Sequence, residues 1–133
     1  MNNNPTYFEQ NIYKIWKEQS FDSKLKTQDN RCIEILQPGE NNSEEAGPDF
    51  KNAKIRIDNI TYVGDVEIDS NYNDWISHKH NINSKYNRVI LHVALFNKTN
   101  QNYVYTKEGR KIPTLCLGNF LDQTTLEELN KIE

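Results

Sequence analysis

Strong positive charge is missing from this sequence. Its 133 residues include 16 lysines and arginines against 19 aspartates and glutamates, which gives a formal net charge of −3. Proteins that bind nucleic acid through their overall charge are polycations, so this mode of binding is not expected here. A local basic patch remains compatible with the composition.

Long apolar runs are also missing. A helix that crosses a bilayer needs about 20 consecutive apolar residues, and no stretch of this chain approaches that length. The segment from Met1 to Pro5 has neither the basic nor the apolar region of a signal peptide. We therefore expect a soluble cytoplasmic protein that does not associate with membranes.

Cysteine occurs only twice, at Cys32 and Cys116. A single pair so far apart in the chain forms no metal-binding motif. Each cysteine lies in a strand-like apolar segment, where a free thiol behaves as a small hydrophobic group. We expect two buried free thiols.

Enough apolar residues are present to build one core. They make up 35% of the chain, and its length suits a single domain over 1–133, with 113–133 as a C-terminal extension. Residues 6–19 carry Phe8, Ile12 and Trp16 at helical spacing behind Thr6, a candidate capping residue. This segment is expected to form the first helix.

Elsewhere, short apolar runs bounded by turn residues predict strands. The expected strands lie at 31–36, 50–57, 61–69, 87–96, 103–106 and 112–117, with a polar loop at 39–48 and further helices at 71–80 and 124–133. The pattern predicts an α/β (α+β) domain in which helices flank a mixed central sheet.

The most informative feature is a set of acids in two neighbouring predicted strands. Asp65, Glu67 and Asp69 alternate with apolar residues, so all three lie on one face of their strand. The predicted hairpin at Asp58-Asn59 places Asp49, which follows a Gly-Pro turn, beside Glu67. Like charges crowded on one face repel unless a cation compensates them. We therefore predict a divalent metal site, Mg²⁺ or Mn²⁺, with Asp49, Glu67 and Asp69 as ligands.

Simpler structural roles compete with this interpretation. Asp65 is expected at the surface, where the strand starts. Asp69 is an alternative cap for the following helix, because Asp-Ser-Asn is rich in capping residues. Glu67 is the hardest acid to explain without a partner, because its neighbours predict burial and a buried lone carboxylate is costly.

Histidines and a tryptophan follow the acids. His78 and His80 are candidates for binding a metal or protonating a leaving group. In the alternative interpretation, one of them caps the helix and the other is a plain surface residue. His92 lies in the most apolar strand and is favoured as a hydrogen-bonded core histidine over a ligand. Trp75 is expected to be a packing anchor, and the alternative is an exposed side chain that stacks on a nucleic-acid base. Lys54 or Arg56 is expected to contact phosphate.

The helix, three-strand, helix, strand order, together with Pro48-Asp49 and Glu67-Ile68-Asp69, resembles the PD-(D/E)XK nuclease-like superfamily. The resemblance implies a restriction-endonuclease-like core in which Asp49 and Glu67 bind Mg²⁺ and a lysine assists the attacking water. Asp69 stands in the lysine position, where a carboxylate would bind metal, act as a base or leave the site inactive. Lys54 on the neighbouring strand is the candidate replacement.

A closer resemblance covers most of the chain, and its motifs occur in order. They are Glu45-Ala46-Gly47-Pro48-Asp49-Phe50, Asn52-Ala53-Lys54-Ile55, Gly64-Asp65-Val66-Glu67-Ile68, Asp74-Trp75, His78-Lys79-His80, Tyr86-Asn87 and Val89-Ile90-Leu91-His92-Val93. Together they resemble the bacterial domain-of-unknown-function 2851 family. Members of that family are usually longer, so the resemblance is to their N-terminal part, and they typically carry histidine at the position of Asp69.

Two functions are therefore expected from different classes. The first is a metal-dependent nucleic-acid phosphodiesterase in which Asp49 and Glu67 hold the metal, and Asp69, His78 or His80 orients the water. The second is a catalytically degenerate nuclease-fold module that binds nucleic acid or protein. A toxin–antitoxin or phage-defence component is a weaker third hypothesis. A homodimer is compatible with each.

Overall fold

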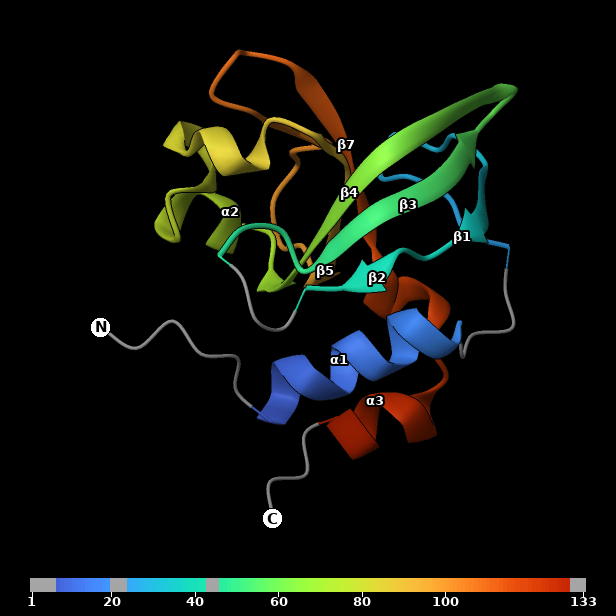
Figure 1. Cartoon of the computed structure of the whole chain (residues 1–133). Coiled ribbons are helices and arrows are strands. Elements are labelled where there is room, and N and C mark those ends of the chain that lie inside the picture. Colours follow the sequence, from blue (N-terminus) through green and yellow to red (C-terminus); the bar gives the residue numbers. More distant parts are fainter. Residues whose placement is uncertain (1–6, 20–23, 43–45, 130–133) are drawn as a thin grey trace.

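The computed structural model describes residues 7–19, 24–42 and 46–129 and shows a curved sheet with helices on both faces (Figure 1). The chain runs through α1 (Tyr7–Glu18), β1 (Ile33–Gln37), β2 (Glu40–Asn41), β3 (Phe50–Ile57), β4 (Ile60–Asn71), α2 (Asp74–Ser77), the 3₁₀ turns η1 (His80–Ile82) and η2 (Ser84–Tyr86), β5 (Val89–Phe96), β6 (Tyr103–Tyr105), β7 (Lys111–Cys116), the 3₁₀ turn η3 (Leu117–Phe120) and α3 (Gln123–Leu129). No helix within the described ranges is long and apolar enough to cross a membrane.

The sheet is mixed, as expected from the sequence. Its strand order is β1-β3-β4-β5-β7-β6, and β2 also pairs with β3. Strand β3 is antiparallel to β1 and β4, whereas β5 is parallel to both β4 and β7. A parallel pair needs a crossover connection, and the segment with α2, η1 and η2 supplies it between β4 and β5. This crossover covers one face of the sheet.

The β3–β4 hairpin forms where the Asp58-Asn59 signal predicts it. Ile57 pairs with Ile60 across a two-residue turn, and Asp58 has a positive φ of 53°. Aspartate and asparagine tolerate this left-handed backbone better than most residues. The hairpin aligns the start of β3 with the middle of β4, where Phe50 pairs with Val66.

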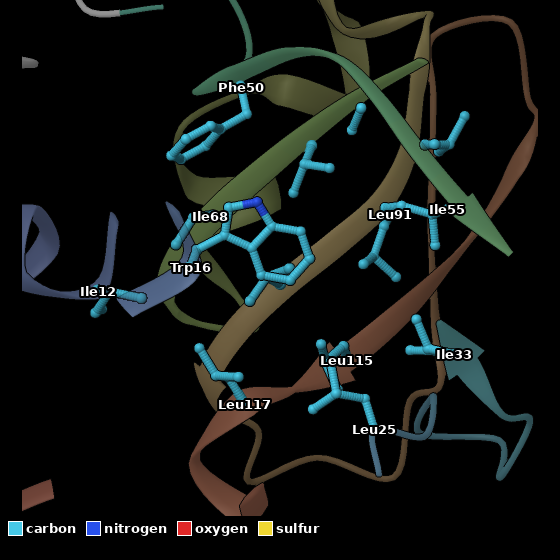
Figure 2. Close-up of a cluster of buried hydrophobic side chains, with 14 of the residues drawn as sticks. Ile12, Trp16, Leu25, Ile33, Phe50, Ile55, Ile68, Leu91, Leu115 and Leu117 are labelled. Carbon is cyan, nitrogen blue, oxygen red and sulfur yellow. The ribbon is translucent and has the colours of Figure 1, made fainter. Parts of the chain in front are cut away.

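One hydrophobic core fills the sheet face beneath α1 and α3. Ile12 and Trp16 of α1 are fully buried, which confirms the predicted apolar stripe of that helix. They pack against a cluster from the strands that includes Phe50, Ile55, Ile68, Leu91 and Leu115 (Figure 2). Thr6 and the side chain of Phe8 lie outside the described residues.

A second, smaller core lies on the opposite face, under the crossover. Trp75 is fully buried there, as a packing anchor should be, and its Nε1 donates to the carbonyl of Tyr105 at 3.0 Å. Tyr86, Ala94 and Ile112 belong to the same cluster. This core forms the platform on which the candidate site is built.

Several expectations about local structure were wrong. Cys32 is exposed rather than buried, although Cys116 is buried as expected. The helix expected over 71–80 is reduced to α2, because β4 continues to Asn71 and Lys79 adopts a left-handed φ of 63°. The loop expected at 39–48 contains β2, which pairs with β3. The predicted tail helix begins one residue early, and 130–133 lie outside the described residues.

A pair of isoleucine substitutions tests the position of the main core. Ile55→Ala removes a fully buried side chain and should lower the free energy of unfolding by about 2–5 kcal/mol. Ile60→Ala removes the same atoms from a side chain that is 59% exposed and should cost less than about 1 kcal/mol. Urea denaturation followed by circular dichroism measures both, and equal costs would contradict this placement of the core.

Candidate metal centre

Strand β4 carries three acids on the face beneath the crossover. Asp65, Glu67 and Asp69 are 1%, 4% and 1% exposed, and Glu67 pairs in register with His92 of β5. The alternation predicted from the sequence therefore holds. What the alternation did not show is that all three carboxylates are covered.

The expectation that Asp65 lies at the surface was wrong. Its carboxylate accepts a hydrogen bond from the backbone N–H of Asn52 at 3.3 Å, and Lys51 Nζ lies 3.5 Å from Asp65 Oδ2. Asn52 has a left-handed φ of 59° at the irregularity in the β3–β4 register. Asp65 thus has a cation of its own and stabilises a β-bulge.

Asp49 lies beside Glu67, as the hairpin predicts. The backbone N–H of Asp49 donates to Glu67 Oε1 at 3.2 Å. Its own carboxylate accepts from Tyr13 Oη at 2.8 Å and from the backbone N–H of Ile68 at 2.9 Å. No local pattern in the sequence marks Tyr13, which lies next to the apolar stripe of α1.

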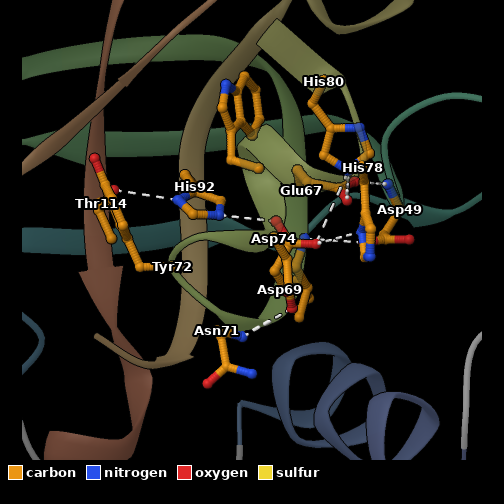
Figure 3. Close-up of polar contacts among 12 residues, drawn as sticks. Asp49, Glu67, Asp69, Asn71, Tyr72, Asp74, His78, His80, His92 and Thr114 are labelled. Atoms are coloured by element: carbon orange, nitrogen blue, oxygen red, sulfur yellow. Dashed lines mark hydrogen bonds and ion pairs between the residues drawn. The ribbon is translucent and has the colours of Figure 1, made fainter. Parts of the chain in front are cut away.

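His78 and His80 bring their rings to the same carboxylates (Figure 3). His78 Nδ1 lies 3.7 Å from Asp69 Oδ1, and His80 Nε2 lies 2.9 Å from Glu67 Oε2 and 3.9 Å from Asp69 Oδ1. One possible ligand atom from each of Asp69, His78 and His80 lies within 4.8 Å of the others. The alternative roles as a helix cap and a plain surface residue do not describe His80, which is buried.

His80 is held in place without hydrogen bonds. Its ring stacks on the ring of Tyr86, with the ring centroids 4.0 Å apart. It also forms a T-shaped contact with Trp75, with the centroids 5.4 Å apart. Despite the short approach to Glu67, neither ring nitrogen forms a hydrogen bond of normal geometry with a described residue. Buried polar atoms almost always have partners. A cation between these side chains would use the unpartnered nitrogen, so the donor set fits a metal.

His92 has the role of a hydrogen-bonded core residue, as favoured from the sequence. It is fully buried, and its Nε2 lies 2.9 Å from Asp69 Oδ2 while its Nδ1 lies 3.2 Å from Thr114 Oγ1. This contact fixes one oxygen of Asp69 and leaves Oδ1 directed toward His78 and His80. The α2 helix begins after Asn73, so Asp69 does not cap it.

Burial and crowding perturb the titration of the cluster. Desolvation, with the nearby charges of Asp49 and Asp69, raises the pKa of Glu67 well above its usual value. Desolvation also raises the pKa of Asp49 to about 7. For Asp69, burial opposes ionisation, but the nearby imidazoles of His78 and His92 outweigh it and lower the pKa to about 2.

The histidines respond in opposite directions. Desolvation lowers the pKa of His80 to about 4, so its imidazole is neutral at pH 7 and able to bind a metal. The carboxylate of Asp69, 3.7 Å from His78 Nδ1, raises the pKa of the half-exposed His78. Over the described ranges, the ion pairs of Glu67 and Asp69 are with histidines, and none is with lysine or arginine.

The two predicted phosphate contacts lie elsewhere. Lys54 is exposed and pairs with Val63, four residues before Glu67, so the strand holds it about 13 Å along from the cluster. Arg56 is also exposed and pairs with Glu34 at 3.4 Å. Lys51, which the sequence did not single out, is the lysine on the side of the acids.

Comparison with known proteins agrees with the sequence resemblance at the level of the family. A family model described as "Protein of unknown function (DUF2851)" matches residues 9–133. No curated protein and no solved structure matches the chain.

The shifted pKa of Asp49 predicts a pH effect on stability in the presence of a chelator. Its folded pKa of about 7 exceeds the ~3.9 of an unfolded aspartate, so its stabilising contribution is complete below about pH 4 and is lost as the pH rises to about 7. Asp49→Asn should make this downward slope in the curve of unfolding free energy against pH shallower, and the slope that remains belongs to Glu67, whose pKa is also raised.

Asp122→Asn is the matched control. Its hydrogen bonds with Thr125 lower the pKa of Asp122, so its titration falls outside this range of pH. Urea denaturation at half-unit steps from pH 4 to 8 gives both curves. An Asp49→Asn curve parallel to the wild-type curve would contradict a raised pKa.

Proposed function

This chain belongs to the DUF2851 family, whose description names no activity, and we propose from its candidate metal centre that it is a divalent-metal-dependent nucleic-acid phosphodiesterase. The observation that carries the proposal is the convergence of Glu67 and Asp69 with His80 in a buried cluster without lysine or arginine among its described ion pairs. Within it, Glu67 has no positively charged partner, because the imidazole of His80 is neutral at pH 7, so a bound cation would be needed to keep Glu67 ionised.

The order of the elements supports a nuclease-like core. A helix, strands β1, β3 and β4, the α2 crossover and the parallel strand β5 follow the order of the PD-(D/E)XK superfamily. Asp49 lies directly before β3, and Glu67 lies in β4. These are the places that the superfamily uses for its acids, and a restriction-endonuclease-like fold is part of the proposal.

The donor set favours some metals over others. Asp69 and Glu67 offer oxygen, and the neutral imidazole of His80 offers nitrogen. Carboxylate oxygens alone suit Mg²⁺, whereas imidazole suits transition metals. We therefore place Mn²⁺ ahead of Mg²⁺ in this site. A divalent cation bound here would lower the pKa of a water and neutralise phosphate charge.

The surrounding residues have separate roles in the proposed reaction. Tyr13 fixes Asp49 through its hydroxyl, and His92 fixes Asp69 through Nε2. His78 is half-exposed with a raised pKa, so it can donate a proton to the leaving oxygen near neutral pH. Lys51, whose amine lies 3.5 Å from Asp65 Oδ2, replaces Lys54 as the lysine assigned to the phosphate contact.

The second candidate function is a catalytically degenerate module of the same fold that binds nucleic acid or protein. The observation that favours it is Asp69, which stands in the lysine position of the superfamily and is bound to His92. This candidate keeps the fold and lacks turnover.

Glu67→Gln tests the proposal and should weaken Mn²⁺ binding at least tenfold, because an amide oxygen replaces a charged ligand. It should also reduce cleavage of DNA or RNA, single- or double-stranded, at least 100-fold. With a chelator present, the variant should be more stable than wild type above pH 7, because the amide needs no compensating cation. Calorimetry, gel assays and urea denaturation measure the three effects.

Glu34→Gln makes the same change on an exposed side chain and should match wild type in all three. Mn²⁺ binding by the wild type without cleavage of any substrate would favour the degenerate module. Absence of Mn²⁺ and Mg²⁺ binding would contradict both the phosphodiesterase and the metal centre.

A further inference from the structure

A basic cavity opens on the face of the sheet opposite the metal centre. Its volume is about 130 Å³, and its lining includes Arg31, Tyr62, Ile90, Tyr103, Arg110 and Lys111. Tyr62 pairs in register with Ile55, which belongs to the core beneath α1, so the cavity is on the α1 side of the sheet. The acids of β4 lie on the other side, with His92 and Trp75.

The cavity lies where the segment before β1 meets β6 and β7, because Arg31 comes from that segment and Tyr103 and Lys111 from those strands. The same segment lies against β7, where the backbone N–H of Gln28 donates to the carbonyl of Thr114 at 2.7 Å. Lys26 and Cys32 then form a bridge that leads into β1. Ile57 and Ile90 belong both to the core beneath α1 and to the lining, so the cavity lies at the edge of that core, with its mouth toward solvent. Clefts at the surface are the usual places for small ligands.

The three cations at the mouth are held in position. Arg110 donates through Nη2 to the carbonyl of Val89 at 2.7 Å. Lys111 Nζ lies 4.2 Å from the centre of the Tyr103 ring, a cation–π contact. Arg31 Nε lies 2.9 Å from Asp29 Oδ2. Fixed side chains lose less entropy when a ligand binds.

The charge of the mouth is not balanced. Among the described residues, no carboxylate lines the cavity, and Asp29 compensates Arg31 alone. Arg110 interacts with neutral carbonyls and Lys111 with a neutral ring, so two positive charges remain. The chain as a whole has a net charge of −3, so a cluster of positive charges at one cavity differs from the overall charge of the protein.

An aromatic ring lies beside the cations. Tyr62 is 36% exposed, and Ile57 and Ile90 form an apolar floor next to it. Arginine and lysine recognise phosphate, and an exposed tyrosine ring stacks on a flat base. We propose that this cavity binds the phosphate group of a nucleotide and that Tyr62 stacks on its base. The proposal does not rest on the metal centre or on catalysis.

Calorimetry with adenosine monophosphate and with inorganic phosphate tests the site, with a chelator present to exclude metal bridging. The nucleotide should bind about tenfold more tightly than phosphate, and Tyr62→Leu should remove this difference. Arg31→Gln and Lys111→Gln should each weaken nucleotide binding about tenfold or more. Arg56→Gln, an exposed arginine on β3, is the control and should bind like wild type.

A 5′-phosphorylated trinucleotide separates two sources of the same chemistry. Tighter binding than the mononucleotide identifies the end of a strand as the ligand, and equal or weaker binding identifies a free nucleotide. Circular dichroism should show all variants folded, and Lys111→Arg, which keeps the charge, should retain binding. Absence of nucleotide binding, binding no tighter than phosphate, or an equal loss in Arg56→Gln would overturn the proposal.

Discussion

The burial of Glu67 and Asp69 in β4, away from lysine and arginine in the described structure, is the constraint on which the site depends. Removing a carboxylate from water costs several kcal/mol unless charge or hydrogen bonds replace the solvent. The protein meets this cost unevenly. Asp69 has His92 and His78, and its pKa falls, whereas desolvation by burial and neighbouring negative charge raise the pKa of Glu67. The unbalanced member of the pair is the best argument for a bound cation.

The β3–β4 hairpin and the crossover between β4 and β5 each bring a side chain to this cluster. The hairpin places Asp49 next to Glu67, and the crossover turns back after α2 so that His80 reaches the same carboxylates. Lys79 adopts a left-handed conformation at that turn, which costs energy for a residue with a side chain. We interpret that strain as part of the arrangement that presents His80 to Glu67.

Much of the fold and of the candidate site could be predicted from the sequence, because both follow from alternation and turn signals. The same signals miss contacts between distant parts of the chain. Period-two alternation placed the acids of β4 on one face, and the Asp-Asn turn predicted the hairpin beside Asp49. Alternation shows which residues share a face of the strand, but it does not show what packs on that face. Asp65 was therefore expected at the surface, although it is buried. Alternation also assumes regular strands, and the bulge at Asn52 breaks that assumption, so Lys51 lies with the acids. Lys54 is kept away from them by its register, opposite Val63. Long-range contacts such as Tyr13 with Asp49 leave no local pattern.

The proposed activity requires a cation in the cluster of β4. Crystals soaked in Mn²⁺, with anomalous difference maps recorded at the manganese edge, test this directly. We expect one strong peak within about 2.0–2.6 Å of the carboxylate oxygens of Asp69 and Glu67 and near His80 Nε2. A well-ordered cluster without an anomalous peak at saturating Mn²⁺, or a peak only at other acids, would contradict the account.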